Sequence, residues 1–135
     1  MREHQYEVRV RYSETDQMGI VYHGNYAQYF EMGRVEWLRN LGLSYKWMEE
    51  NGIMLPVVSL NINYKKPARY DDLLIVKTIF KSQSSVKIEF DYEIYNESQE
   101  LLTIANSVLV FVDMKTGRPT QPPGYVNEKL TGLNN

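Results

Sequence analysis

One segment organises the chain: Tyr12-Ser-Glu-Thr-Asp16-Gln-Met-Gly-Ile-Val-Tyr-His23-Gly-Asn-Tyr26-Ala-Gln-Tyr-Phe-Glu31-Met-Gly-Arg34-Val-Glu-Trp-Leu-Arg-Asn-Leu41. A polar loop carries Asp16 and ends at His23, where a long amphipathic helix is expected to begin. Asn25 and Gln28 have the spacing of a capping box and Gly42 is a typical stop, so we expect a helix over residues 25–41. The segment thus combines a carboxylate, unpaired backbone N–H groups and a helix with a buried face.

The helix has one apolar face that must be covered. Gly33 lies in the middle of it and costs about 1 kcal/mol relative to Ala, which close approach of a sheet would explain. Arg34 falls within the same stripe, so we expect it to pair with Glu31 or with another acid. The residues of this face are Tyr26, Ala27, Phe30, Gly33, Trp37, Leu38 and Leu41.

The rest of the chain is mainly β. Residues 5–12 alternate apolar and polar side chains, with Tyr12 on the apolar side, and Ser44 is expected to cap a short helix over 45–50. Further strands are expected at 58–64, 73–81, 86–95 and 101–112, and a helical turn at 126–130. The short polar turns between the strands are typical of an antiparallel meander. We therefore predict a single α+β domain over residues 1–135, with the sheet curled around the helix.

The same pattern predicts an oligomer. One helix cannot cover a five-stranded sheet, so apolar surface and an unpaired strand edge remain, which favours a homodimer. A homotetramer is the alternative that the sequence leaves open.

Bulk composition narrows the class of protein. The chain has 135 residues with 15 Lys+Arg against 17 Asp+Glu, so its balanced charge gives no reason to expect nucleic acid as a partner. It has no Cys, and its N-terminal residues are polar. No apolar run reaches the roughly 18 residues of a membrane span, so we expect a cytoplasmic protein.

Several kinds of chemistry lack the residues they need. No Gly-rich phosphate loop occurs, which argues against nucleotide triphosphate and nicotinamide cofactors. The two histidines, His4 and His23, are too few for a His-rich metal site. We expect neither a cofactor nor a metal.

The remaining candidates, a loop carboxylate beside the backbone N–H groups of a helix start, suit acyl transfer to water. A carboxylate such as Asp16 can activate water or attack directly, while N–H groups and the helix dipole stabilise the developing oxyanion. A thioester is the natural substrate of so sparse a site, because its thiol has a pKa of about 8.5 and leaves without a strong general acid.

Each candidate also has a purely structural interpretation. Asp16 could close an Asx turn, and His23 could be an ordinary residue at the helix entrance. Glu31 could serve only Arg34, and Tyr12 could be a rim aromatic. Three strand-end cations could either be solvated or bind an anionic ligand: Lys65, Lys66 and Arg69.

The run Asp16-Gln-Met-Gly-Ile-Val-Tyr-His23-Gly-Asn-Tyr26, followed by Phe30-Glu31 and Arg34-Val-Glu-Trp-Leu, resembles the hot-dog-fold acyl-CoA thioesterases. It is most similar to the 4-hydroxybenzoyl-CoA thioesterase family and its YbgC-like branch. The likeness continues through Tyr64-Lys-Lys-Pro67-Ala-Arg-Tyr-Asp-Asp72-Leu, which looks like that family's strand-crossing segment, and, more weakly, through 110–119.

The resemblance implies a hot-dog fold, in which a five-stranded antiparallel sheet wraps one long central helix, and active sites at a subunit interface. It implies an acyl-CoA or acyl-carrier-protein thioester as substrate, with coenzyme A as part of that substrate. Asp16 would be the nucleophile or general base, the His23 N–H would belong to the oxyanion hole, and Tyr12 and the His23 side chain would be associated with the site. Lys65, Lys66 and Arg69 are our candidates for the coenzyme A phosphates.

Two alternatives stay open. Another branch of hot-dog thioesterases carries its catalytic Glu on the central helix, so Glu31 could act or assist. A non-catalytic acyl-CoA or lipid-binding module could use the same pocket. A hot-dog hydratase would need a His and Asp pair in another motif, which the sequence lacks.

Overall fold

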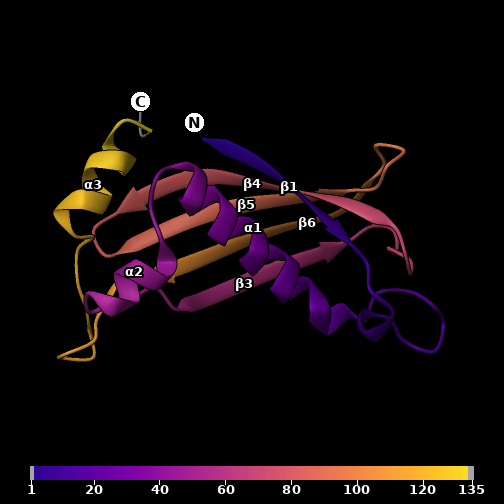
Figure 1. Cartoon of the computed structure of the whole chain (residues 1–135), viewed down its shortest axis with the longest axis horizontal. Helices are drawn as coiled ribbons and strands as arrows, with labels where there is room; N and C mark the ends of the chain where they lie inside the picture. Colours follow the sequence, from indigo (N-terminus) through magenta and orange to yellow (C-terminus); the bar gives the residue numbers. More distant parts are fainter. Residues whose placement is uncertain (1, 134–135) are drawn as a thin grey trace.

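A five-stranded antiparallel sheet covers one side of a long helix in the computed structural model, which describes residues 2–133 (Figure 1). The helix is α1, Tyr26–Asn40. In spatial order the strands are β1 (Glu3–Arg9), β4 (Leu73–Ser84), β5 (Lys87–Tyr95), β6 (Leu101–Val110) and β3 (Val57–Tyr64). The predicted sheet wrapped around one central helix is confirmed.

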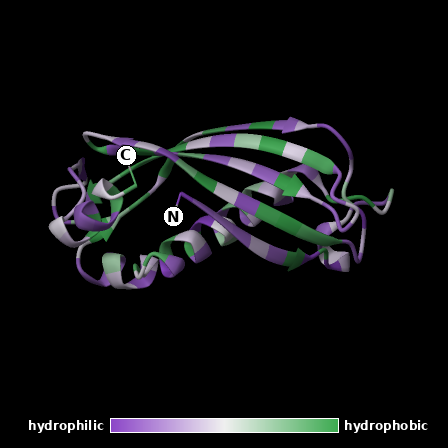
Figure 2. Cartoon of the chain, turned by 90° about the horizontal axis from the view of Figure 1, so that it is seen from above, coloured by the Kyte–Doolittle hydropathy of each residue, from purple (hydrophilic) through white to green (hydrophobic). Residues whose placement is uncertain are grey.

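The strands form where the sequence alternates. In β5, Ile88, Phe90, Tyr92 and Ile94 are buried, and the residues between them are at least partly exposed. Successive strand side chains point to opposite faces, so this period places one face on the helix and the other outside. The banding of hydrophobic and hydrophilic residues along the central strands shows the same alternation (Figure 2).

The strand order differs from the predicted meander. The runs β4, β5 and β6 are sequential neighbours, but β3 pairs with β6 and β1 pairs with β4. The short turn predicted at 68–72 is part of a longer segment, 65–72, that crosses the end of the sheet, as the family resemblance implies. The N–H groups of Lys65 and Lys66 donate to the Leu102 carbonyl at one side of the sheet, and Val10 N–H donates to the Asp72 carbonyl at the other. The crossing leaves β3 and β1 as the two sheet edges.

Helix α1 lies close against the sheet at Gly33. A Cβ placed on Gly33 would lie 2.5 Å from Thr78 Oγ1 and 2.9 Å from a Val76 methyl group on β4. The close approach predicted for this glycine is therefore confirmed. One turn farther along, Trp37 stacks on Phe80 with ring centroids 5.6 Å apart.

The start of the helix corrects one prediction. Asn25 precedes α1 but does not cap it with its side chain, so the predicted capping box does not form. Its Nδ2 instead donates to the Glu14 carbonyl at 2.9 Å, and a short 3-10 turn, His23–Asn25, leads into the helix. The amide is used to fasten the preceding loop to the helix.

The first strand also ends earlier than predicted. It stops at Arg9, and Tyr12 begins a 3-10 turn that runs to Glu14. Tyr12 is therefore not on the buried face: it is 78% exposed, and its ring meets the edge of Tyr70.

The expected acidic partner of Arg34 is absent. Arg34 is buried, and none of the carboxylates in residues 2–133 lies within ion-pair distance of it. Its Nη1 donates to the Tyr92 hydroxyl at 3.1 Å instead. Both expectations for this residue, a pair with Glu31 and a pair with another acid, are wrong within the subunit.

Short elements close the end of the molecule opposite the Asp16 loop (Figure 1). Ser44 caps α2, Tyr45–Glu50, by accepting from Trp47 N–H at 3.1 Å, as predicted. The last long strand ends at Val110, and the tail forms a longer helix than the predicted turn. The remaining elements are β2 (Ile53–Met54), β7 (Val112–Asp113), β8 (Arg118–Pro119) and α3 (Gly124–Thr131). None of the helices in 2–133 has the length and apolarity needed to cross a membrane.

Candidate active site

A buried carboxylate, Glu14, anchors the loop that carries Asp16. Glu14 is 3% exposed, and its Oε1 accepts from the Arg11 N–H at 2.9 Å and from the Tyr29 hydroxyl at 2.8 Å. Its Oε2 accepts from the Arg11 guanidinium, with Nε at 3.0 Å and Nη2 at 2.9 Å. Because Tyr29 lies on α1, this side chain ties the loop to the helix.

The bonds to Glu14 keep it ionised. Burial alone would raise the pKa of Glu14, but the hydrogen bonds from the Arg11 backbone and from Tyr29, with the Arg11 guanidinium, outweigh it and lower the pKa. Burial, reinforced by the negative charge of Glu14, raises the pKa of Tyr29. The phenol therefore stays a donor and the carboxylate an acceptor.

A second set of contacts holds the far side of the loop. Val21 N–H donates to the Ala68 carbonyl at 2.8 Å, and Tyr22 N–H donates to the Glu14 carbonyl at 2.9 Å. Ile20 forms an isolated antiparallel bridge with Arg69. The loop is thereby fixed both to the helix and to the crossing segment 65–72.

Asp16 lies at the tip of this anchored loop and is exposed. Its Oδ1 accepts from Met18 N–H at 2.8 Å, which is the Asx turn that we considered as its structural role. Gly19 completes the turn with a φ of 77°, a conformation that favours glycine. Oδ2 has no hydrogen-bond partner among residues 2–133, so the turn orients the carboxylate and leaves one oxygen available.

The helix entrance supplies backbone donors. In the described part of the chain, neither the His23 N–H nor the Gly24 N–H donates to a protein acceptor, as expected at the first residues of a helical segment. The His23 carbonyl accepts from the Tyr64 hydroxyl at 3.1 Å. This bond ties the helix entrance to the end of β3.

These groups surround one hollow of about 370 Å³. Its walls come from the Asp16 loop, the helix entrance, the end of β3 and the crossing segment. The residues that line it are Asp16, Ile20, Val21, His23, Tyr26, Tyr64, Lys65, Lys66 and Pro67. The structure thus brings together four of the seven residues singled out from the sequence: Asp16, His23, Lys65 and Lys66.

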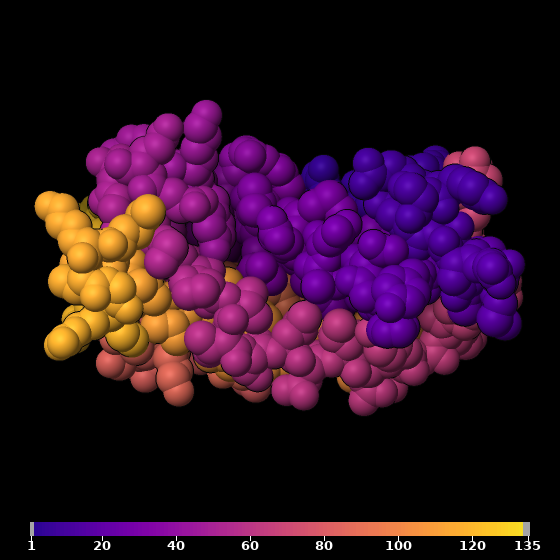
Figure 3. All heavy atoms as spheres, turned by 90° about the horizontal axis from the view of Figure 1, so that it is seen from below, coloured from indigo at the N-terminus to yellow at the C-terminus, as the bar shows by residue number. Residues whose placement is uncertain are grey.

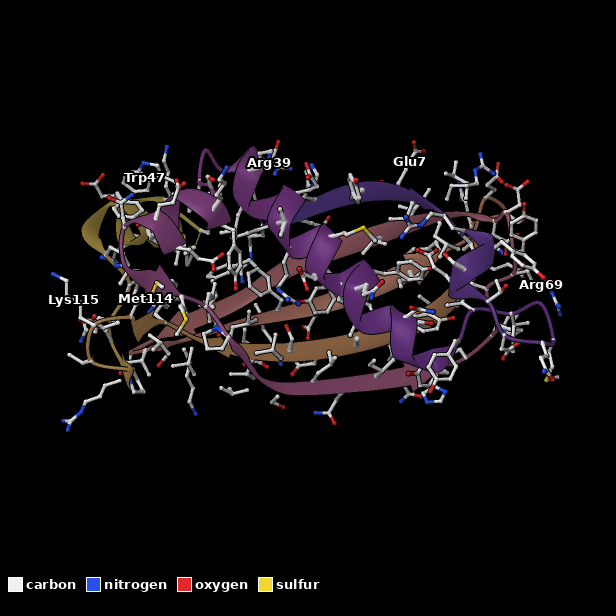
Figure 4. The ribbon with its side chains drawn as sticks, turned by 60° about the horizontal axis from the view of Figure 1, so that its bottom comes forward. Glu7, Arg39, Trp47, Arg69, Met114 and Lys115 are labelled. Atoms are coloured by element: carbon white, nitrogen blue, oxygen red, sulfur yellow. The ribbon has the colours of Figure 1, made fainter. Side chains whose placement is uncertain are left out.

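The other three lie outside this hollow. Tyr12 and Arg69 do not line it, although Arg69 is at the same end of the molecule (Figure 4). Glu31 lines a different hollow, farther along α1. Within one subunit, therefore, Glu31 and Asp16 do not share a site.

Two tyrosines of the hollow were not singled out. Tyr26 packs edge-on against Tyr64 with ring centroids 5.1 Å apart, and burial raises the pKa of Tyr26. In the sequence Tyr64 immediately precedes Lys65, which was the available signal. Its contact with His23 depends on the fold, since the two residues lie on different elements.

The cations of the hollow differ in their partners. Lys66 Nζ lies 2.8 Å from Glu100 Oε2 in an exposed ion pair. Lys65 has no ion pair among residues 2–133. Lys65 is therefore the cation of the two that is available to an anionic ligand.

Comparison with known proteins identifies relatives over most of the chain. The model of the Thioesterase-like superfamily matches residues 10–130. The "Putative acyl-CoA thioesterase YneP" of Bacillus subtilis (strain 168) is 44% identical over 115 residues, which cover 85% of this chain and 83% of that protein. The acyl-CoA thioester hydrolase YbgC of Escherichia coli O6:H1 is 33% identical over 116 residues, covering 86% and 87% of the two chains.

A solved structure agrees with the fold. The DHNA-CoA thioesterase of Staphylococcus aureus superposes with a TM-score of 0.95 at 37% identity, and the match covers 99% of this chain and 92% of that one. The resemblance drawn from the Asp16 to Leu38 motif is confirmed by these matches. This chain belongs to the Thioesterase-like superfamily and has its hot-dog fold.

Proposed function

We propose that this protein hydrolyses an acyl-CoA to a free carboxylic acid and coenzyme A, with Asp16 as the reacting carboxylate. One observation carries the proposal: Asp16 and His23 line the same hollow, and among residues 2–133 one oxygen of Asp16 and the N–H of His23 have no partner. The relatives named as acyl-CoA thioesterases support the substrate class.

The chemistry follows from these groups. The thioester carbonyl oxygen would accept from the N–H of His23 and Gly24, whose dipoles stabilise the negative charge that develops there. Asp16 would either attack the carbonyl carbon or take a proton from the attacking water. In the general-base route, water adds to the acyl carbon as Asp16 takes its proton, and the carbon–sulfur bond then breaks. In the nucleophilic route, a bond from Asp16 to the acyl carbon replaces the carbon–sulfur bond, and water then hydrolyses this anhydride, which frees the carboxylic acid and restores Asp16. In both routes the thiolate leaves and takes up a proton.

Lys65 and Lys66 are proposed to bind the phosphates of coenzyme A. Both line the hollow, and Lys65 has no ion pair with a carboxylate among residues 2–133. Arg69 is a weaker candidate, because it lies outside the lining. Since exposed cation–phosphate attraction is screened by salt, KM for acyl-CoA is expected to rise with ionic strength.

We further propose that two copies pair along the free edge of β3. The outward residues of the other edge, β1, are polar, whereas β3 exposes Val57, Val58 and Tyr64, and none of its eight residues is fully buried. An exposed apolar edge strand favours pairing with another chain. Figure 3 views the molecule from this side, where β3 and the segment after it run below the helix and the Asp16 loop.

Thiol release from short, medium, long and aromatic acyl-CoAs tests the function, with wild type beside Asp16→Asn and Glu31→Gln. We expect Asp16→Asn to lose at least about a hundredfold in kcat, the size of a general acid–base contribution, and Glu31→Gln to remain active. An active Asp16→Asn protein beside an inactive Glu31→Gln protein would move the reacting carboxylate to the helix. Tight binding of acyl-CoA by the wild type without turnover would instead identify a binding module.

A further inference from the structure

Arg34 is an unusual residue for a helix face that packs on a sheet. It is 6% exposed, and its guanidinium meets the Tyr92 hydroxyl, which in turn lies 2.6 Å from Ser107 Oγ. Its Nε is buried without a hydrogen-bond partner, and no carboxylate in residues 2–133 reaches it. Burying a charge without a counter-charge is costly, so an acceptor from outside the subunit would offset a real penalty.

Arg34 faces a second hollow, of about 480 Å³, between the middle of α1, α2 and the start of β3. The other charged residues that line it are solvated or paired, unlike Arg34. Arg39 pairs with Glu36, and Glu31, Glu49 and Lys46 are exposed. The Tyr45 hydroxyl, another lining group, donates to the Leu55 carbonyl. Arg34 is the buried charge of this hollow, and its apolar walls are supplied by Val35, Leu43, Leu55 and Val57.

The two hollows lie at opposite ends of one strand edge. The Asp16 hollow uses the first turn of α1 with the end of β3 at Tyr64, whereas the Arg34 hollow uses the middle of α1 with the start of β3 at Val57. If two β3 strands pair antiparallel about a twofold axis near their middle, the end of one β3 lies beside the start of the other. The Asp16 hollow of each subunit then opens toward the Arg34 hollow of its partner.

On the basis of the proposed thioesterase function and β3 pairing, we propose that Arg34 of one subunit selects the acyl group whose thioester is held at Asp16 of the other. The acyl group would extend across the interface along the apolar walls. Its preferred form would carry a hydrogen-bond-accepting or anionic oxygen at the end remote from the thioester, because that oxygen would satisfy the buried guanidinium. Arg34 is thus assigned as a specificity-determining residue.

Matched acyl-CoAs with the same carbon skeleton, one of each pair bearing a carboxylate or hydroxyl remote from the thioester, test the assignment. Hexanoyl-CoA is compared with adipoyl-CoA, and benzoyl-CoA with hydroxybenzoyl-CoA, as ratios of kcat/KM. For at least one pair we expect the wild type to prefer the oxygen-bearing member by on the order of tenfold or more, as for hydrogen bonds to charged groups. In Arg34→Met the ratio should fall to near one, and Arg34→Lys should recover part of it.

Arg39→Met is the matched control, since Arg39 is on the same helix and lines the same hollow but is exposed and paired. The ratio of kcat/KM values within each pair should be the same for Arg39→Met as for the wild type. A wild type without preference in either pair, or an Arg34→Met protein that keeps the preference, would overturn the assignment. If the wild type hydrolyses neither pair, the proposed function has failed. Calorimetry can then compare the affinity of wild type and Arg34→Met for the two members of each pair, which measures the contribution of Arg34 to binding.

Mixed dimers test whether Arg34 acts across the interface. Two differently tagged chains are co-expressed and the mixed dimer is isolated. When one chain carries Asp16→Asn and the other Arg34→Met, one of the two sites keeps both Asp16 and Arg34, so the wild-type ratio should persist at reduced activity. When both changes are in one chain and the partner is wild type, no site keeps both, so the ratio should fall to near one. The reverse pattern would show that Arg34 serves its own subunit.

Discussion

Single residues in this protein often serve two purposes. The Asx turn at Asp16 is one of the structural roles considered from the sequence, and it is present, yet it occupies only one carboxylate oxygen. The turn and the proposed reaction are therefore compatible, because the first fixes the direction of the group that the second uses. Asn25 differs, because its side-chain amide holds the Asp16 loop through the Glu14 carbonyl and does not cap the helix.

Glu14 should make stability depend on pH. Its pKa is lower in the folded protein than the ordinary value of about 4.3, so the stabilisation is fully present above that value and is lost as pH falls through the folded pKa. Glu14→Gln should lower the free energy of unfolding near pH 7 and flatten its decline toward acid. Urea unfolding at a series of pH values measures both effects.

Glu7→Gln provides the comparison, because Glu7 is exposed and projects from the edge strand β1 (Figure 4). This control should follow the wild-type curve. Equal acid sensitivity in Glu14→Gln and wild type would remove Glu14 from the explanation of the pH dependence.

At the scale of elements, the contact between α1 and β4 is set by Gly33. A methyl group there would overlap Thr78 and Val76 of the strand, so Gly33→Ala should destabilise the fold by about 1–3 kcal/mol despite the better helix propensity of Ala. Chemical denaturation measures the change. Gly124→Ala at the start of α3, where a Cβ would meet no atom within 4 Å, should be neutral or stabilising. A Gly33→Ala protein as stable as this control would mean that the helix can move away from the sheet at little cost.

The positions of the strands and helices along the sequence were largely predictable, whereas the pairing of the strands in the sheet was not. Alternation located the strands because one face of the sheet is buried, and the motif from Asp16 to Arg34 identified the family. Strand order depends on which edge the segment 65–72 reaches. The spacing of the turns predicts a simple meander, and only the family resemblance of this segment pointed to a crossing.

The candidate site divides in the same way. Asp16, His23 and Lys65 were singled out because they lie in recognisable local sequence, and the structure places all three on one hollow. The bond from Tyr64 to His23 could not be found, since it joins separate elements. The environment of Arg34 was predicted wrongly, because the rule that a buried Arg has an acidic partner was applied within one subunit.

At the scale of the whole molecule, β3 is the least protected part of the sheet. Replacing both Val57 and Val58 by Lys should weaken the proposed pairing, because it removes apolar contact area and brings like charges together at a symmetric interface. Analytical ultracentrifugation should show a shift toward monomer, with thioesterase activity per chain falling in parallel.

Met114→Lys is a suitable control, as Met114 is also an exposed apolar residue but lies on the short β7–β8 turn, far from Arg69 along the molecule (Figure 4). It should leave the mass unchanged. A wild type that is monomeric at assay concentration, or a double Lys variant that keeps the wild-type mass, would exclude pairing through this edge.

The close contact of α1 with β4 at Gly33 also fixes where the helix residues lie along the sheet, because sliding the helix would bring a residue larger than glycine against Thr78. About 12 Å of helix separate Tyr26 from Arg34, at 1.5 Å per residue. In the proposed dimer, Tyr26 and Arg34 of one helix therefore belong to two different candidate sites. Inserting or deleting one residue between them would rotate Arg34 by about 100° out of its position and alter the depth available to the acyl chain. In the proposed dimer, the position of each Arg34 relative to the site that it serves therefore depends on how α1 is placed on the sheet and not on a loop.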